Sequence, residues 1–194
     1  IGRALDARSI YVRPGSNSAA GAWYPHPANY APQTFDRLVD SLRQAAQTAQ
    51  AEGMTLALEG HVLSLLDTPR RMRDVIDAVG SPALKFNTDP VNFIGTVRDV
   101  YDPSRVLNEL ASLLGDVTVA AHLKDLTVRD SLVLHIDEVV IGEGHLDYGR
   151  LLPQLEQMNS EMYGIIEHLP DDAIPRARAG LMRAADKAGI TLAA

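Results

Sequence analysis

Short apolar segments alternate with longer amphipathic segments along this chain. The short segments have the length of buried strands and are bounded by glycine, proline and asparagine residues. The longer segments carry apolar residues at spacings of three and four, which indicates helices with one buried face. Strands that alternate with helices predict an α/β fold, in which helices cover a parallel sheet. The predicted strands span residues 9–16, 54–60, 84–90, 117–125 and 163–169.

Capping signals define the predicted helices. Thr34 is expected to cap the first helix, and Thr68 with Pro69 to begin the second. Pro153 would lie in the first turns of the fourth helix, where proline is tolerated. The helices are expected over residues 35–52, 68–80, 103–115, from 148–150 onward, and 175–190.

The alternation is interrupted after the fourth strand. Residues 127–148 contain β-branched residues and glycines but little helical periodicity. This composition predicts a loop or hairpin and then a short strand near residues 138–141. The chain would then have about six strand positions.

Composition limits the classes of protein that fit. The 194 residues are 46% hydrophobic and 22% charged, which is enough for one sizeable core and favours a single domain. The net charge of −7 and the lack of a basic cluster argue against nucleic acid as a partner. Cysteine is absent, so a metal would be bound by oxygen and nitrogen. No apolar segment reaches the roughly 20 residues that cross a bilayer, and we expect a cytoplasmic protein without a membrane partner.

Four of the predicted strands end in an acidic or imidazole side chain. LALEGH, LKFNTDPVN, VAAHLKD and YGIIEHL contribute Glu59, Asp89, His122 and Glu167. The carboxyl ends of barrel strands converge on one face, so these residues are expected to meet around one metal ion. Three carboxylates and an imidazole form a hard, anionic site that suits Mn²⁺ or Mg²⁺. A lone glutamate at a strand end is more often a surface residue, but four such residues in register favour a metal site.

The order LALEGH, NTDPVN, AHLKD, GEGHLDY and IIEHL resembles the xylose-isomerase-like barrel family of sugar phosphate isomerases and epimerases. That family includes D-tagatose 3-epimerase, hydroxypyruvate isomerase and inosose dehydratase relatives. The resemblance implies a (β/α)8 TIM barrel that binds one divalent cation through Glu59, Asp89, His122 and Glu167. Mn²⁺ or Mg²⁺ is expected, with Co²⁺ or Zn²⁺ as alternatives. Glu59 and Glu167 would be the acid/base pair, and the metal would stabilise the enediolate formed by proton abstraction.

A complete barrel of this kind has eight strands and about 250 residues. About six strand–helix units are predicted here, the chain starts with Ile1, and IGRALDA resembles the end of a helix. We therefore expect residues 1–194 to form one partial barrel domain that lacks the first two units. Open strand edges would favour association between copies of the chain.

Six residues are candidates for contacts with a small sugar or keto-polyol substrate. Several also have a structural interpretation: Asn92 as a turn residue, Lys124 as an ion-pair partner of Asp125, and His61 as a strand cap. The loop over residues 23–30 could instead be a lid packed on a neighbouring loop or subunit. The candidates are Trp23, His26, His61, Asn92, Lys124 and His145.

Several functions fit this pattern. The leading hypothesis is a metal-dependent isomerase or epimerase of a small sugar or keto-polyol. An inosose dehydratase-like lyase would start from the same proton abstraction, and a non-catalytic sugar-binding barrel is the alternative from another class. An endonuclease IV-like phosphodiesterase shares the barrel, but it requires further histidine ligands and positive charge that the sequence lacks.

Overall fold

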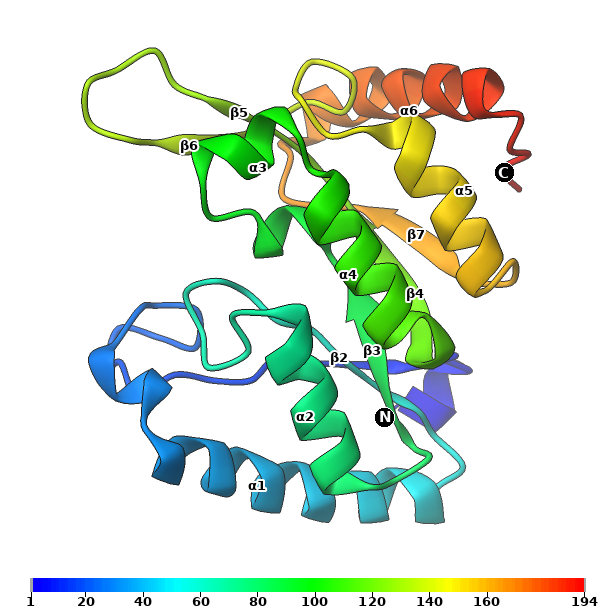
Figure 1. The fold of residues 1–194 in the computed structure, drawn as a ribbon. Helices are drawn as coiled ribbons and strands as arrows, with labels where there is room; N and C mark the ends of the chain where they lie inside the picture. Colours follow the sequence, from blue (N-terminus) through cyan, green and yellow to red (C-terminus); the bar gives the residue numbers. More distant parts are fainter. Residues whose placement is uncertain (1, 194) are drawn as a thin grey trace. The chain divides into compact units, whose positions relative to one another are not determined.

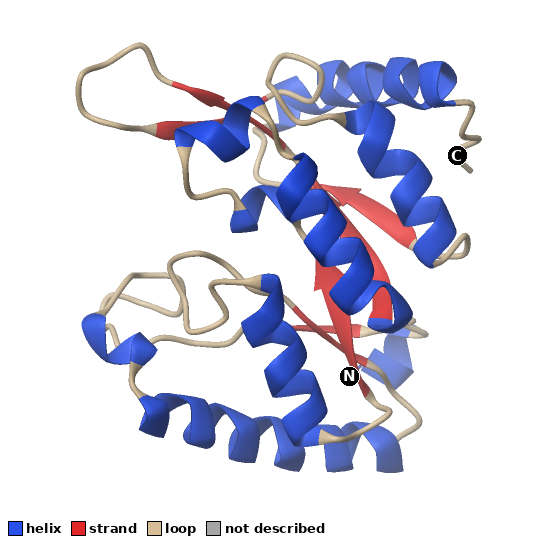
Figure 2. Ribbon diagram, viewed as in Figure 1, coloured by secondary structure: helices blue, strands red, loops and turns tan. Residues whose placement is uncertain are grey.

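The computed structural model of the protein describes residues 2–193. Helices and strands alternate along the chain, as the hydrophobic pattern predicts (Figures 1 and 2). The chain divides into two compact units, Ile1–Thr88 with Val117–Ala120, and Asp89–Asp116 with Ala121–Ala194. Among residues 2–193, no helix combines the length and apolar character needed to cross a membrane.

The first unit contains parallel strands and the helices that connect them. Strand β2 is fully buried and pairs in register with the strands on either side, with Leu56 opposite Ile10 and Leu84. Helices α1 and α2 pack against each other (Figure 1). The elements are η1 (Gly2–Leu5), β1 (Ile10–Val12), η2 (Pro27–Tyr30), α1 (Pro32–Ala51), β2 (Leu56–Leu58), α2 (Pro69–Val79) and β3 (Leu84–Thr88).

Helix α1 starts earlier than its predicted cap. It begins at Pro32, because proline has the φ angle of the first helical position and loses no backbone hydrogen bond there. Thr34 lies inside the helix and donates its hydroxyl proton to the Ala28 carbonyl oxygen at 2.7 Å. The prediction that Thr34 caps this helix is therefore wrong. The prediction for α2 is confirmed, because the Thr68 side chain accepts from the Arg71 N–H and Gly80 ends the helix in a left-handed conformation.

The second unit contains most of the remaining elements. Strand β4 continues from the first unit into the second, at residue 121. Helix α3, which the sequence pattern did not predict, is only one turn long. The elements are η3 (Pro90–Phe93), α3 (Val97–Tyr101), α4 (Ser104–Leu114), η4 (Gly115–Val117), β4 (Thr118–Leu123), β5 (Asp125–Val128), β6 (Ile136–Val139), α5 (Tyr148–Met158), β7 (Tyr163–Ile166), η5 (Asp171–Ala173) and α6 (Ile174–Ala188).

The strands within residues 2–193 form two sheets. Five of them make a sheet in the order β1-β2-β3-β4-β7, which fits part of a (β/α)8 barrel and confirms the predicted fold class. Strands β5 and β6 pair antiparallel with each other. The short strand expected near residues 138–141 thus lies at Ile136–Val139, in a hairpin. Arg129 and Asp137 form an ion pair, 2.7 Å between Nε and Oδ2, beside the hairpin turn.

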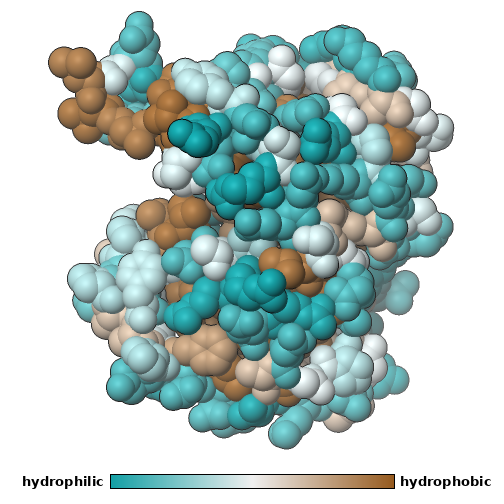
Figure 3. Space-filling view, in the orientation of Figure 1, coloured by the Kyte–Doolittle hydropathy of each residue, from teal (hydrophilic) through white to brown (hydrophobic). Residues whose placement is uncertain are grey.

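The tip of this hairpin is apolar and exposed. Leu132, Val133 and Leu134 are 107%, 68% and 52% exposed. They form the projecting hydrophobic group at the upper left of Figure 3. These side chains therefore add nothing to the core of the described residues.

Helix α6 approaches the segment after β6 at a glycine. Gly180 is buried, and a Cβ atom at this position would overlap the carbonyl oxygen of Ile141. Ile141 is itself only 1% exposed. The close approach of helix and backbone therefore requires glycine at position 180.

We predict that Gly180→Ala lowers the free energy of unfolding by about 1–3 kcal/mol, because the backbone of residue 141 must move. Alanine is otherwise favoured over glycine inside a helix by about 1 kcal/mol. Gly149→Ala in α5 is the matched control, since its Cβ would meet only the Asp147 carboxylate, at 3.3 Å. Urea unfolding followed by circular dichroism measures both variants. A Gly180→Ala protein as stable as the control would contradict the packing described here.

Candidate functional site

Three of the four predicted metal ligands lie together in the second unit. Asp89 directly follows β3, His122 is the fifth residue of β4, and Glu167 directly follows β7. Each occupies the carboxyl end of a parallel strand, where barrel enzymes carry their catalytic groups. Asp89 and His122 are buried, and the Glu167 side chain is 25% exposed.

The distances between these side chains are short. The Nδ1 atom of His122 lies 3.1 Å from Oε2 of Glu167 and 4.0 Å from Oδ2 of Asp89. One ligand atom from each residue lies within 4.8 Å of those of the others. Ligand atoms of one Mg²⁺ lie about 2.1 Å from the ion, so any two are at most about 4.2 Å apart. The measured Nδ1 separations therefore fit a shared divalent cation.

Lys124 bridges the two carboxylates of this cluster. It is 3% exposed, and its Nζ lies 2.6 Å from Oδ2 of Asp89 and 2.8 Å from Oε2 of Glu167. It also donates to Oδ1 of Asn92 at 3.4 Å. His122 and Lys124 are two residues apart on one strand end, so both side chains point to the same face.

The cluster perturbs the protonation of its members. Burial alone would raise the pKa of the Glu167 carboxyl, but hydrogen bonds from His122 and Lys124 and the Lys124 charge lower this pKa to about 2. Burial opposes the charge on Lys124, yet Asp89 and Glu167 outweigh it and raise the pKa of the ammonium. Glu167 and Lys124 are therefore both charged at neutral pH.

Glu59, the fourth predicted ligand, lies in the first unit directly after β2 and is 2% exposed. The Tyr11 hydroxyl donates to its Oε2 at 2.5 Å, and the Asn87 amide donates to its Oε1 at 3.3 Å. Tyr11 comes from β1 and Asn87 from β3, so the strands on both sides of β2 orient this carboxylate. Asn87 is two residues before Asp89 in the chain.

Asp125 has a different role from the predicted ion pair with Lys124. Its carboxylate accepts hydrogen bonds from the backbone N–H groups of four residues, at 2.9–3.1 Å. A Cβ at residue 144 would overlap the Asp125 carboxylate, so glycine is required there. The segment GEGHLDY is thereby fixed to the strand end that carries Lys124. The four donors are Leu126, Gly142, Gly144 and Leu146.

The aromatic loop of the first unit carries two of the substrate candidates. The Trp23 ring lies 5.8 Å from the ring of His61, at an interplanar angle of 48°. His61 Nδ1 accepts from the Leu63 N–H, so this nitrogen has a structural role. His26 caps η2 by accepting from the Ala28 N–H, so its Nδ1 has a structural role.

Two histidines of the second unit also have partners. His145 is exposed and packs edge-on against Tyr101, with ring centroids 5.0 Å apart. His168 has a left-handed backbone, with φ of 62°. Its Nδ1 lies 3.2 Å from Oε2 of Glu138 and its Nε2 lies 3.5 Å from Oε2 of Glu167. This unusual conformation places the imidazole beside the Glu167 carboxylate.

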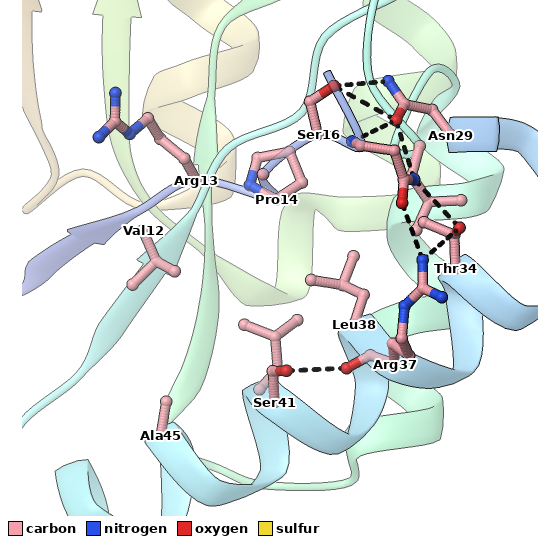
Figure 4. Close-up of a pocket in the computed structure, with 14 residues that line it drawn as sticks. Val12, Arg13, Pro14, Ser16, Asn29, Thr34, Arg37, Leu38, Ser41 and Ala45 are labelled. Carbon is pink, nitrogen blue, oxygen red and sulfur yellow. Dashed lines mark hydrogen bonds between the residues drawn. The ribbon is translucent and has the colours of Figure 1, made fainter. Parts of the chain in front are cut away.

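A cavity of about 390 Å³ in the first unit lies between the end of β1 and α1 (Figure 4). Apolar side chains, including Val12, Leu38 and Leu42, line one side of it. Asn29 joins the polar rim, where it bonds Ser16 and Asn17, and Arg37 bonds Thr34. None of the predicted site residues lines this cavity.

Sequence reasoning missed the residues that orient Glu59. Tyr11 pairs in register with Ala57, and Ala57 is two residues before Glu59. Residues two apart on a strand share a face, so Tyr11 and Glu59 point to the same side of the sheet. The alternation of side chains along the strands could have predicted that Tyr11 and Glu59 share a face. The position of Asn87, two residues before Asp89, could likewise have predicted that these two residues share a face.

Comparisons with known proteins agree with the fold. A profile of the xylose isomerase-like TIM barrel matches residues 1–188. Comparison with curated protein sequences gives no match.

Three solved structures are similar in fold. A xylose isomerase-like TIM barrel protein from Mycobacterium smegmatis, in complex with magnesium, is 16% identical with a TM-score of 0.66, and the match covers 84% of this chain and 53% of that chain. A D-tagatose 3-epimerase-like protein is 17% identical with a TM-score of 0.74, and the match covers 97% of this chain and 66% of that chain. A probable 3-DHS dehydratase from Bacillus anthracis is 16% identical with a TM-score of 0.71, and the match covers 93% of this chain and 64% of that chain.

The chain thus spans just over half to about two thirds of the length of these structures. At such low identities the likeness shows the fold. The profile match extends over nearly all of the sequence, and the alternating strands and helices have the predicted order. The chain therefore belongs to the xylose isomerase-like TIM barrel family.

Proposed function

We propose that this protein is a divalent-metal-dependent isomerase or epimerase of a small sugar or keto-polyol. The observation that carries the proposal is the cluster of Asp89, His122 and Glu167 at the carboxyl ends of parallel strands. Its nitrogen and carboxylate donors suit Mn²⁺ or Mg²⁺. The similarity in fold to a magnesium complex and to an epimerase-like protein supports the same reading.

We assign Glu59 as the fourth ligand. It is a buried carboxylate at the end of the strand that precedes β3, and Asn87 connects it to the segment leading into Asp89. Its oxygens accept hydrogen bonds from Tyr11 and Asn87, and a carboxylate has about four lone-pair sites, so it can also ligate a cation. With Glu59 included, the site offers three carboxylates and one imidazole.

The two glutamates are proposed to exchange the proton. One carboxylate removes the proton from the carbon beside the substrate carbonyl, and the other returns a proton, so that delivery to the opposite face yields an epimer. A bound cation would supply Lewis-acid stabilisation of the negative charge on the substrate oxygens. Hydrogen bonds from His122 and Lys124 outweigh burial and lower the pKa of the Glu167 carboxyl to about 2, so Glu167 is a weak base. We therefore assign the first abstraction to Glu59.

Four of the remaining candidates are assigned to the substrate. The Trp23 ring lies beside the His61 ring, at an interplanar angle of 48°. Aromatic side chains bind the carbon face of a sugar, and this is the role that we assign to Trp23 and His61. Asn92 and His145 are assigned to substrate hydroxyls.

We predict that the protein catalyses exchange of deuterium from D₂O into a keto sugar in the presence of Mn²⁺. Glu59→Gln and Glu167→Gln should each reduce the exchange rate by about 100-fold to 10,000-fold, since an amide cannot accept the proton. Glu156→Gln, at an exposed position of α5, is the control and should exchange normally. Nuclear magnetic resonance of a ketose panel measures the exchange.

The products decide between related activities. Conserved mass indicates isomerisation or epimerisation, and loss of water indicates a lyase. Substrate binding without exchange, unaffected by either glutamine variant, would replace the enzyme proposal with a sugar-binding barrel.

We predict that Mn²⁺ stabilises protein previously treated with EDTA. At about 100 times the dissociation constant, one bound ion adds about 2.7 kcal/mol to the free energy of unfolding, a rise in melting temperature of several degrees. Asp89→Asn should abolish the rise, because the amide can still cap η3 but ligates Mn²⁺ weakly. Asp186→Asn, an exposed position on α6, should keep it. Equal stabilisation of both variants would argue against Asp89 as a ligand.

A further inference from the structure

The ammonium of Lys124 uses the same oxygens that the proposed metal would use. It contacts Oδ2 of Asp89 at 2.6 Å and Oε2 of Glu167 at 2.8 Å. These two oxygens are also the carboxylate atoms nearest Nδ1 of His122. A cation ligated by these groups would therefore share its ligand atoms with the ammonium.

Lys124 also reduces the repulsion between two carboxylates of the second unit. Asp89 is fully buried and Glu167 is mostly buried, so two negative charges face each other where water is scarce. Like charges at short range in such surroundings repel strongly. The ammonium lies between them and contacts an oxygen of each, so it offsets one of the two negative charges.

The charges can be counted within the second unit. Asp89 and Glu167 contribute −2, and Lys124 contributes +1. The ammonium repels a cation bound to these carboxylates, and this repulsion grows with the charge of the cation.

We propose that Lys124 is a built-in counter-ion, which holds Asp89 and Glu167 in ligating position in the metal-free protein and weakens the binding of the divalent cation. The inference rests on the proposed metal site and concerns what sets its affinity and charge selectivity. Lys124 acts here as a positioning residue, through the two carboxylates. Its contact with Asn92 keeps the Nζ atom directed toward them.

The test is metal affinity in the full chain, measured by calorimetry with Mn²⁺ and Tb³⁺. Lys124→Met, which has a similar length and no charge, should bind Mn²⁺ about tenfold more tightly than the wild type. Its gain for Tb³⁺ should be larger, about 30-fold, because the removed repulsion scales with the charge of the ion. Lys124→Arg should stay within about threefold of the wild type for both ions.

Two controls separate this effect from general changes in charge or folding. Lys187→Met removes an exposed charge at the end of α6 and should leave both affinities unchanged. The metal-free Lys124→Met protein should melt at a lower temperature than the wild type, because the carboxylates lose their counter-ion. If this variant does not fold, Lys124→Gln retains hydrogen bonding to the carboxylates and should show the same gains in affinity.

The outcomes distinguish this inference from the proposed function. Unchanged or weaker Mn²⁺ binding by both neutral variants, with a wild type that binds Mn²⁺, overturns the counter-ion role alone. Tighter binding without any deuterium exchange by the wild type supports the counter-ion role and overturns the proposed reaction. Failure of the wild type and all variants to bind either ion overturns both.

Discussion

The structure depends on the neutralisation of buried carboxylates at the ends of parallel strands. A parallel sheet brings polar groups to its carboxyl edge, and each buried charge there needs a partner or hydrogen bonds. Glu59 receives a phenol and an amide from the two neighbouring strands. Asp89 and Glu167 share the ammonium of Lys124 and the imidazole of His122. Glu59 thus has neutral partners from the first unit, whereas Asp89 and Glu167 are bridged by a charged group of the second.

The buried carboxylate of Asp125 is stabilised by backbone N–H groups instead of by charged side chains. Four N–H donors surround its carboxylate and fix the segment that follows the β5–β6 hairpin. Gly144 permits this close approach, because any side chain would collide with the carboxylate. Tyr148, the first residue of α5, donates its hydroxyl proton to the Lys124 carbonyl oxygen at 2.8 Å. The strand end that carries Lys124 is therefore held by the same loop and helix that Asp125 positions.

Much of the fold was predictable from the sequence because the signals were local. Thr68 and Gly80 define α2 through capping chemistry, and apolar spacing identified α4 and α6. The first turn of α1 was misjudged because Pro32 and Thr34 are competing start signals only two residues apart. The short helix α3 carries too few residues for periodicity to identify it. Strand β6 pairs with β5 and does not join the parallel sheet. This pairing depends on contacts between strands, which the sequence of one segment does not encode.

The sequence by itself determined the alternation of strands and helices and the candidate ligands at four strand ends, because apolar periodicity and residue type are properties of short segments. Only the tertiary structure decided that Lys124 bridges Asp89 and Glu167 and leaves Asp125 to the backbone. It also selected Tyr11 and Asn87 as the groups that orient Glu59. These pairings join residues that are far apart in the chain, and they follow from strand register and burial. Neither can be read from one segment, because each depends on which strands become neighbours.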